Sequence, residues 1–124
     1  MKIFSFLVAL SLAGCTGTSE PMSLATVPGQ MTTEAEFAAL AGRRLETGEA
    51  DFVVLNADGT LTGVYGGIET LGTWELRDGY FCRVVTTGPA GAMAEDCQLF
   101  VRDGNQLTIS RDKGAGKAAV YTIT

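Results

Sequence analysis

The stretch GTWELRDGYFC, residues 72–82, decides the fold. Trp74 and Leu76 alternate with polar residues, which is the period of a strand that buries one face. The Asp-Gly dipeptide at 78–79 is typical of a two-residue hairpin turn, and residues 80–86 predict the returning strand. The stretch therefore predicts an antiparallel β-hairpin.

Further strands and turns extend from this hairpin in both directions. The other segments that predict strands are residues 51–55, 60–65, 97–102, 106–111 and 118–123, separated by turns and loops rich in Gly, Asn and Asp. Seven or eight short strands of this kind predict a mostly β fold, either a small antiparallel β-barrel or a sandwich. A barrel has the advantage that closure removes exposed strand edges.

One short N-terminal helix is predicted to precede the strands. The segment 33–36 (TEAE) has the pattern of a capping box, and Phe37 and Leu40 follow at helical spacing. Gly42 suits the position just past the end of a helix. We expect Phe37 and Leu40 to pack on the main body, so that residues 33–124 form one β-barrel-like domain.

The N-terminus resembles the export segment of bacterial lipoproteins. Leu12-Ala13-Gly14-Cys15 matches their lipobox, and it follows Lys2 and the apolar run from Ile3 to Leu12. This run is too short to span a bilayer, which needs about twenty apolar residues. The resemblance implies a signal peptide over residues 1–14 and a lipid on the sulfur of Cys15, so the partner at this end is a membrane.

The residues after the cysteine indicate where the protein is held. In the lipoprotein family, an aspartate after the lipidated cysteine retains the protein at the inner membrane, and Thr16 stands there instead. The resemblance therefore implies an outer-membrane lipoprotein that faces the periplasm. Residues 15–32 lack hydrophobic periodicity and predict a flexible tether between the lipid and the domain.

Cys82 and Cys97 remain once Cys15 is lipidated. An even pair of cysteines in an exported domain predicts a disulfide, with free buried thiols or a metal site as alternatives. If Cys82 faces Cys97, the pairing of their strands is centred between Pro89 and Ala90, inside a loop rich in Gly and Ala. The loop and the cysteines thus agree on one hairpin, which favours the disulfide.

Composition excludes several kinds of chemistry. The chain has no histidine, which removes Ser-His-Asp and Cys-His catalysis and the usual zinc sites. Its net charge of −5 argues against nucleic acid as a partner. Residues 114–119 match the letters of a dinucleotide fingerprint, but a strand rather than a helix is predicted to follow them. We expect no cofactor and no metal.

Catalysis by carboxylates does not need histidine, so a carboxylate-based hydrolase is an alternative. The acidic residues at 95–96 are adjacent, and adjacent strand residues point to opposite faces. No pair is visibly directed at one cleft, and we therefore expect a protein that is not an enzyme.

The interior of the barrel is expected to be filled by side chains, because a small domain has little surface to spare for lining a cavity. The bulky residues available for this core are Leu61, Tyr65, Trp74, Leu76, Phe81, Leu99 and Ile109. In the alternative, Gly63 and Gly72 leave a pocket, and Trp74 and Tyr65 are then the candidate ligand-binding residues.

A second resemblance covers the middle of the chain. The turn at 58–60 (DGT), the strand start at 72–74 (GTW), the turn at 78–79 (DG), Cys82 and Cys97 resemble a pattern in small exported proteins of alphaproteobacteria. That family is similar to lipocalin-like mini-barrels. The resemblance implies the barrel and carries no assigned activity.

These observations predict a non-catalytic, periplasm-facing lipoprotein that binds an unknown periplasmic protein or a small apolar ligand, or supports the envelope. One alternative is an inhibitor of an exported protease, whose tether would enter the protease cleft. A second alternative is a carrier of lipid or of another small ligand.

Replacing the lipidated residue tests the anchor. Cys15→Ser should release the protein from membranes or leave an uncleaved precursor, because a hydroxyl cannot form the thioether to lipid. Membrane fractionation and mass spectrometry measure both outcomes. Envelope-bound protein with an intact, unmodified Cys15 would contradict the lipoprotein hypothesis.

Overall fold

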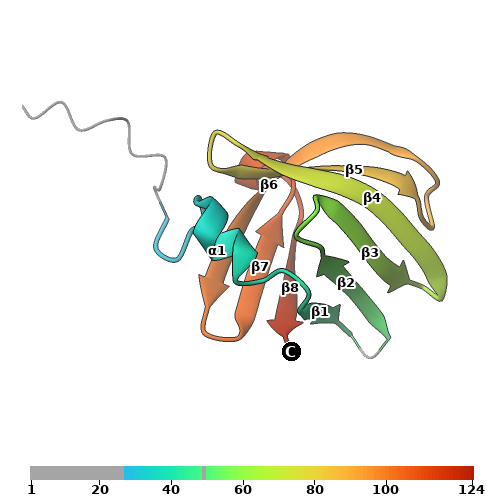
Figure 1. The fold of residues 1–124 in the computed structure, drawn as a ribbon, viewed down its shortest axis with the longest axis horizontal. Coiled ribbons are helices and arrows are strands. Elements are labelled where there is room, and N and C mark those ends of the chain that lie inside the picture. The colour runs from blue at the N-terminus through green and yellow to red at the C-terminus, as the bar shows by residue number, and fades with distance from the viewer. Residues whose placement is uncertain (1–26, 49) are drawn as a thin grey trace, which may run out of the picture.

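Residues 27–48 and 50–124, which the computed structural model describes, form eight antiparallel strands that close into a barrel, with one short α-helix before them (Figure 1). The predicted mostly β fold is confirmed, and the barrel is the observed form of the two that were predicted. The predicted signal peptide, Cys15 and the first part of the tether lie outside the described residues.

The strands follow one another around the barrel in chain order. The elements are α1 (Glu34–Ala38), β1 (Arg44–Thr47), β2 (Asp51–Leu55), β3 (Thr60–Tyr65), β4 (Ile68–Arg77), β5 (Tyr80–Thr87), β6 (Met93–Asp103), β7 (Gln106–Ser110), the 3-10 turn η1 (Asp112–Gly114) and β8 (Ala118–Ile123). The strand that alternation did not predict is β1, whose 4 residues are too few to display a period.

The barrel closes where β1 meets β8. The pairs at this seam are Leu45–Ile123 and Glu46–Thr122. Because β1 is short, it pairs only with the end of β8. Residues 118–121, at the start of β8, pair only with β7 among the described residues. The seam is therefore hydrogen-bonded at one end of the barrel and open at the other.

The predicted hairpin is the β4–β5 connection. Asp78 and Gly79 have φ values of 53° and 78°, and a type I′ turn requires positive φ at both positions. Gly72 meets a different requirement, since a Cβ there would lie 2.2 Å from the carbonyl oxygen of Val84. Gly63 is crowded in the same way by the backbone of β2, so close strand approach explains both glycines without a pocket.

The predicted capping box begins α1. The backbone N–H of Glu36 donates to the hydroxyl of Thr33 at 3.3 Å, and the Glu36 carboxylate accepts from the backbone N–H of Thr33 at 3.1 Å. Phe37 and Leu40 are 1% and 0% exposed. As predicted, both side chains pack into the main body, and α1 covers one end of the barrel (Figure 1).

Four aromatic rings fill the barrel beneath α1. The ring centroid of Phe37 lies 5.1 Å from that of Phe100 and 5.9 Å from that of Phe81. Trp74 stacks on Phe81 at 5.5 Å. We call Phe37, Trp74, Phe81 and Phe100 the aromatic cluster. Ring pairs at these separations add stability beyond the apolar area that they bury.

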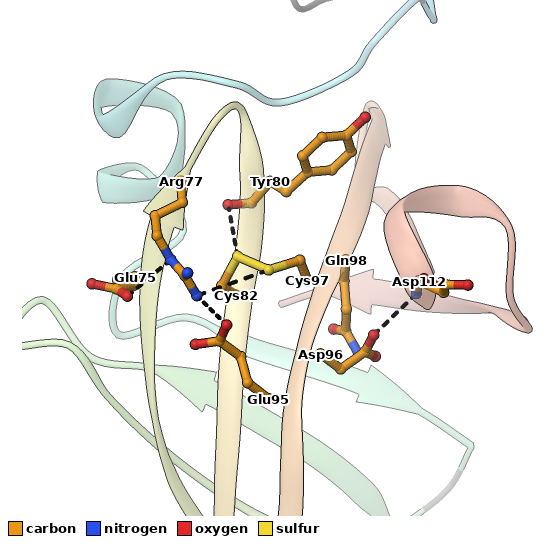
Figure 2. The surroundings of a disulfide bond; sticks show 9 residues. All are labelled: Glu75, Arg77, Tyr80, Cys82, Glu95, Asp96, Cys97, Gln98 and Asp112. Carbon is orange, nitrogen blue, oxygen red and sulfur yellow. Dashed lines mark hydrogen bonds and ion pairs between the residues drawn. A yellow bond between two sulfur atoms is a disulfide. The ribbon is translucent and has the colours of Figure 1, made fainter.

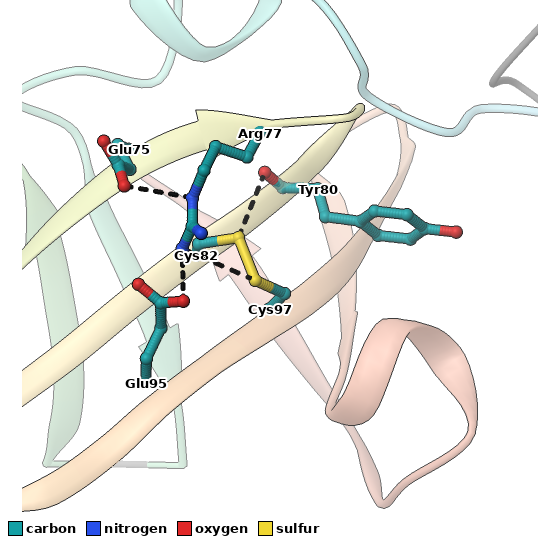
Figure 3. Close-up of polar contacts among 6 residues, drawn as sticks. All are labelled: Glu75, Arg77, Tyr80, Cys82, Glu95 and Cys97. Carbon is teal, nitrogen blue, oxygen red and sulfur yellow. Dashed lines mark hydrogen bonds and ion pairs between the residues drawn. A yellow bond between two sulfur atoms is a disulfide. The ribbon is translucent and has the colours of Figure 1, made fainter.

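The predicted disulfide joins Cys82 of β5 to Cys97 of β6, which face each other in the strand register. Figure 2 shows that the side chain of Arg77 reaches over the two sulfurs. The guanidinium of Arg77 forms ion pairs with Glu75, at 3.0 Å, and with Glu95, and its Nη2 lies 4.0 Å from the sulfur of Cys97 (Figure 3). Arg77 thereby ties β4 to the cross-linked pair of strands.

Removing the cross-link should destabilise the fold. Replacing both cysteines, by Cys82→Ala together with Cys97→Ala, should lower the free energy of unfolding by about 3 kcal/mol, because the bond restricts the unfolded chain. Urea denaturation measures the loss. Dithiothreitol should lower the stability of the wild type to that of the double variant and leave the double variant unchanged. A wild type that is equally stable with and without the reductant would contradict this prediction.

Candidate functional site

A cavity of about 490 Å³ occupies the half of the barrel away from α1. Its apolar wall is formed by Val53, Leu55, Leu61, Phe81, Val85, Phe100 and Ile109. Residues 88–90 of the β5–β6 loop and Lys117 of the β7–β8 connection also line it. These connections lie at the end of the barrel opposite α1, and we call that end the mouth.

The expectation that side chains fill the whole interior is therefore wrong for the half near the mouth. The bulky rings of the aromatic cluster are concentrated under α1. Near the mouth, residues with small side chains, namely Val85, Gly88 and Ala119, take several of the lining positions. An eight-stranded barrel is just wide enough to be filled by large side chains, so small ones leave space.

Arg83 lies inside this apolar wall. It shares the inward face of β5 with Phe81 and Val85, and all three line the cavity. Its side chain is only 11% exposed, and its Nη2 lies 3.9 Å from a carboxylate oxygen of Asp96 on β6. Among the described residues, Nη1 of Arg83 is buried and has no hydrogen-bond partner. Arg83 is thus a largely buried cation whose Nη1 donor lacks a hydrogen-bond partner among the described residues.

Asp96 offers Arg83 limited compensation because its oxygens have other donors. The amide of Gln98 donates to Oδ2 at 2.8 Å, and the backbone N–H of Asp112 donates to Oδ1 at 3.0 Å (Figure 2). Burial lowers the pKa of the Arg83 guanidinium, Asp96 opposes that shift, and the charge of Arg111 adds to it. A guanidinium nevertheless stays charged in proteins.

Two tyrosines meet across the interior beside this arginine. The hydroxyl oxygens of Tyr65 on β3 and Tyr121 on β8 lie 3.0 Å apart, although the two strands are not neighbours in the barrel. Burial and the neighbouring Tyr121 raise the pKa of Tyr65, so it is a neutral phenol at physiological pH. The structure places Tyr65 on the cavity wall, as its candidacy for ligand binding requires.

Trp74, the other candidate from the sequence, lies apart from the cavity. It is in the aromatic cluster behind Phe81, which does line the cavity. The indole N–H of Trp74 donates to the carbonyl oxygens of Asn56 and Thr60, at 3.2 and 3.0 Å. These contacts hold the β2–β3 turn and support the core interpretation of Trp74.

The charges of the cavity are of one sign. Arg83, Arg111 and Lys117 line it, and none of the described lining residues is acidic, although the whole chain has a net charge of −5. Sequence reasoning missed Arg83. Residues two apart on a strand share a face. Because Phe81 was expected in the core, the sequence could have predicted that Arg83 also points inward.

Two further features bear on metal binding and on membrane anchoring. The described residues contain one close group of potential metal ligands, Cys82, Glu95 and Cys97, but both sulfurs are used in the disulfide. Within 27–48 and 50–124, no helix has the length and apolar character needed to cross a membrane.

Comparison with protein-family models, with curated proteins and with solved structures gave no match to this chain.

The sealed end of the barrel should depend on Phe37. Phe37→Ala should lower the free energy of unfolding by about 3–5 kcal/mol, because it leaves a void in the aromatic cluster. Phe52→Ala is the matched control, since Phe52 contacts Arg44 and does not belong to the buried core. Thermal and urea unfolding compare the two variants. If both variants lose the same free energy of unfolding, the proposed role of Phe37 in packing this end of the barrel is contradicted.

Proposed function

We propose that this protein is a non-catalytic binding protein that holds a small, largely apolar ligand in the barrel cavity. In this proposal the lipid on Cys15 anchors the barrel to the outer membrane, where it faces the periplasm. The observation that carries the proposal is the cavity of about 490 Å³, sealed at one end by α1 and open at the mouth. Ligand pockets in proteins commonly enclose about 300–1,000 Å³ within mainly apolar walls.

The outer surface offers less support for a protein partner. The large apolar side chains that are exposed in the described residues are Val27, Ile68 and Val120, which belong to different segments. Single exposed apolar residues are normal, whereas docking surfaces usually carry contiguous patches. The continuous apolar surface of this molecule lies inside the barrel, which favours a small ligand over a protein.

The lining of the cavity also supports binding rather than hydrolysis. A carboxylate-based hydrolase needs two carboxyl groups on either side of the substrate. The residues that line the cavity in the described part of the chain include no carboxyl group.

A neutral fluorophore tests the proposed cavity. Phenylnaphthylamine should bind the purified full chain saturably, at one site, with a rise in fluorescence. Ala119→Phe places a ring in the cavity wall and should weaken binding by about tenfold, which corresponds to about 1.4 kcal/mol. The matched control is Ala118→Phe, because Ala118 is the exposed neighbour on the same strand.

The control variant should bind the fluorophore as the wild type does. Saturable binding that Ala119→Phe leaves unchanged would place the site outside the barrel and contradict the proposal.

A further inference from the structure

We propose that the ligand is an amphipathic carboxylic acid, whose carboxylate is bound by Arg83 and whose apolar body lies along the cavity wall. This inference rests on the proposed function, since it names the chemical class of ligand for the same cavity. It is carried by the position of one largely buried cation, with an unpartnered donor, in a mainly apolar cavity.

Within the described part of the chain, the guanidinium of Arg83 is incompletely hydrogen-bonded. Burying a charged group is costly unless it is paired and hydrogen-bonded. The nearest acidic group, Asp96, lies 3.9 Å from Nη2 and already accepts hydrogen bonds from Gln98 and from the backbone of Asp112. Nη1 lacks a hydrogen-bond partner among the described residues. An anionic oxygen in the cavity would satisfy this donor.

The shape of the guanidinium favours a carboxylate as the bound anion. A guanidinium is a planar fork of donors that matches the two oxygens of a carboxylate, which accept two parallel hydrogen bonds. Tyr65 and Tyr121 add a further donor, because only one of the two hydroxyl protons is used in the bond between them. Both tyrosines line the same cavity as Arg83, so this donor is available to the same ligand.

The remaining wall of the cavity indicates the chemistry of the rest of the ligand. Apart from these polar groups, the wall consists mainly of aliphatic and aromatic side chains, with Leu55, Leu61 and Phe100 at its deeper, plugged side. A ligand with a single charged group and an apolar body fits this distribution. A polyanion does not, because most of its charges would face apolar wall.

The mouth is suited to the entry of an anion. Arg111 and Lys117 lie there and both line the cavity. Cations around an opening raise the local concentration of anions and their rate of entry, and salt screens this effect. The positive charges at the mouth and the guanidinium of Arg83 inside the cavity therefore both favour an anionic ligand.

The test uses competition against phenylnaphthylamine on the purified full chain. Laurate should displace the fluorophore at a concentration at least about tenfold lower than dodecanol, which has the same chain without the charge; this is about 1.4 kcal/mol. Arg83→Met should abolish that preference for the acid and leave binding of the neutral fluorophore intact. Retained fluorophore binding also shows that the variant is folded.

A matched control removes the same charge elsewhere. Arg77→Met changes the guanidinium that covers the disulfide and should leave the preference for laurate unchanged. Replacing both tyrosines, by Tyr65→Phe together with Tyr121→Phe, removes the spare hydroxyl donor and should weaken laurate binding by a few-fold. In both variants the neutral fluorophore should bind as it does to the wild type.

The outcomes separate the two proposals. If phenylnaphthylamine does not bind the wild type, the proposed cavity function fails. If the fluorophore binds but laurate and dodecanol compete equally, or if Arg83→Met retains the preference for laurate, the cavity function stands and the acid inference is overturned. If dodecyl sulfate binds more tightly than laurate, the carboxylate assignment is overturned in favour of a sulfate-like head group.

Discussion

The insertion of Phe37 into one end of the barrel is the interaction on which the rest of the structure depends. An eight-stranded barrel has a fixed, narrow interior, and Phe37 meets Phe81 and Phe100 within it at centroid distances of 5.9 and 5.1 Å. This contact supplies the core that the strands alone do not complete. Because the core is concentrated beneath α1, the other half of the interior does not need to be packed.

The fold thus separates the packed aromatic core from the cavity along one axis. The plugged end holds the aromatic cluster, and the disulfide and the ion pairs of Arg77 cross-link β4, β5 and β6 on the outside. The mouth end holds small inward side chains, a buried arginine and a pair of tyrosines. Placing an incompletely paired cation in a barrel is costly, and the cross-linked strands that carry Arg83 offset this cost.

Local chemistry explains which features could be predicted from the sequence. The Asp-Gly turn, the capping box of α1 and the cysteine pair depend on residues close together or in one hairpin, and all three are confirmed. The cavity was missed because the bulky apolar side chains were counted over the whole chain. Which end of a closed barrel each of these side chains fills depends on the strand register, which the count does not include. Arg83 was missed because a cation on a strand is normally assigned to the solvent face.

The short β1 strand leaves one side of the cavity mouth without backbone pairing, among the described residues. Segments held by few backbone hydrogen bonds unfold locally at a small cost in free energy, without global unfolding. The start of β8 has a paired neighbour on one side only, among the described residues, and it forms part of the mouth. Fraying of this strand would widen the opening while the aromatic cluster and the disulfide stay intact. If the cavity holds a ligand as proposed, substitutions in this one strand should change the lifetime of the bound molecule independently of the melting temperature.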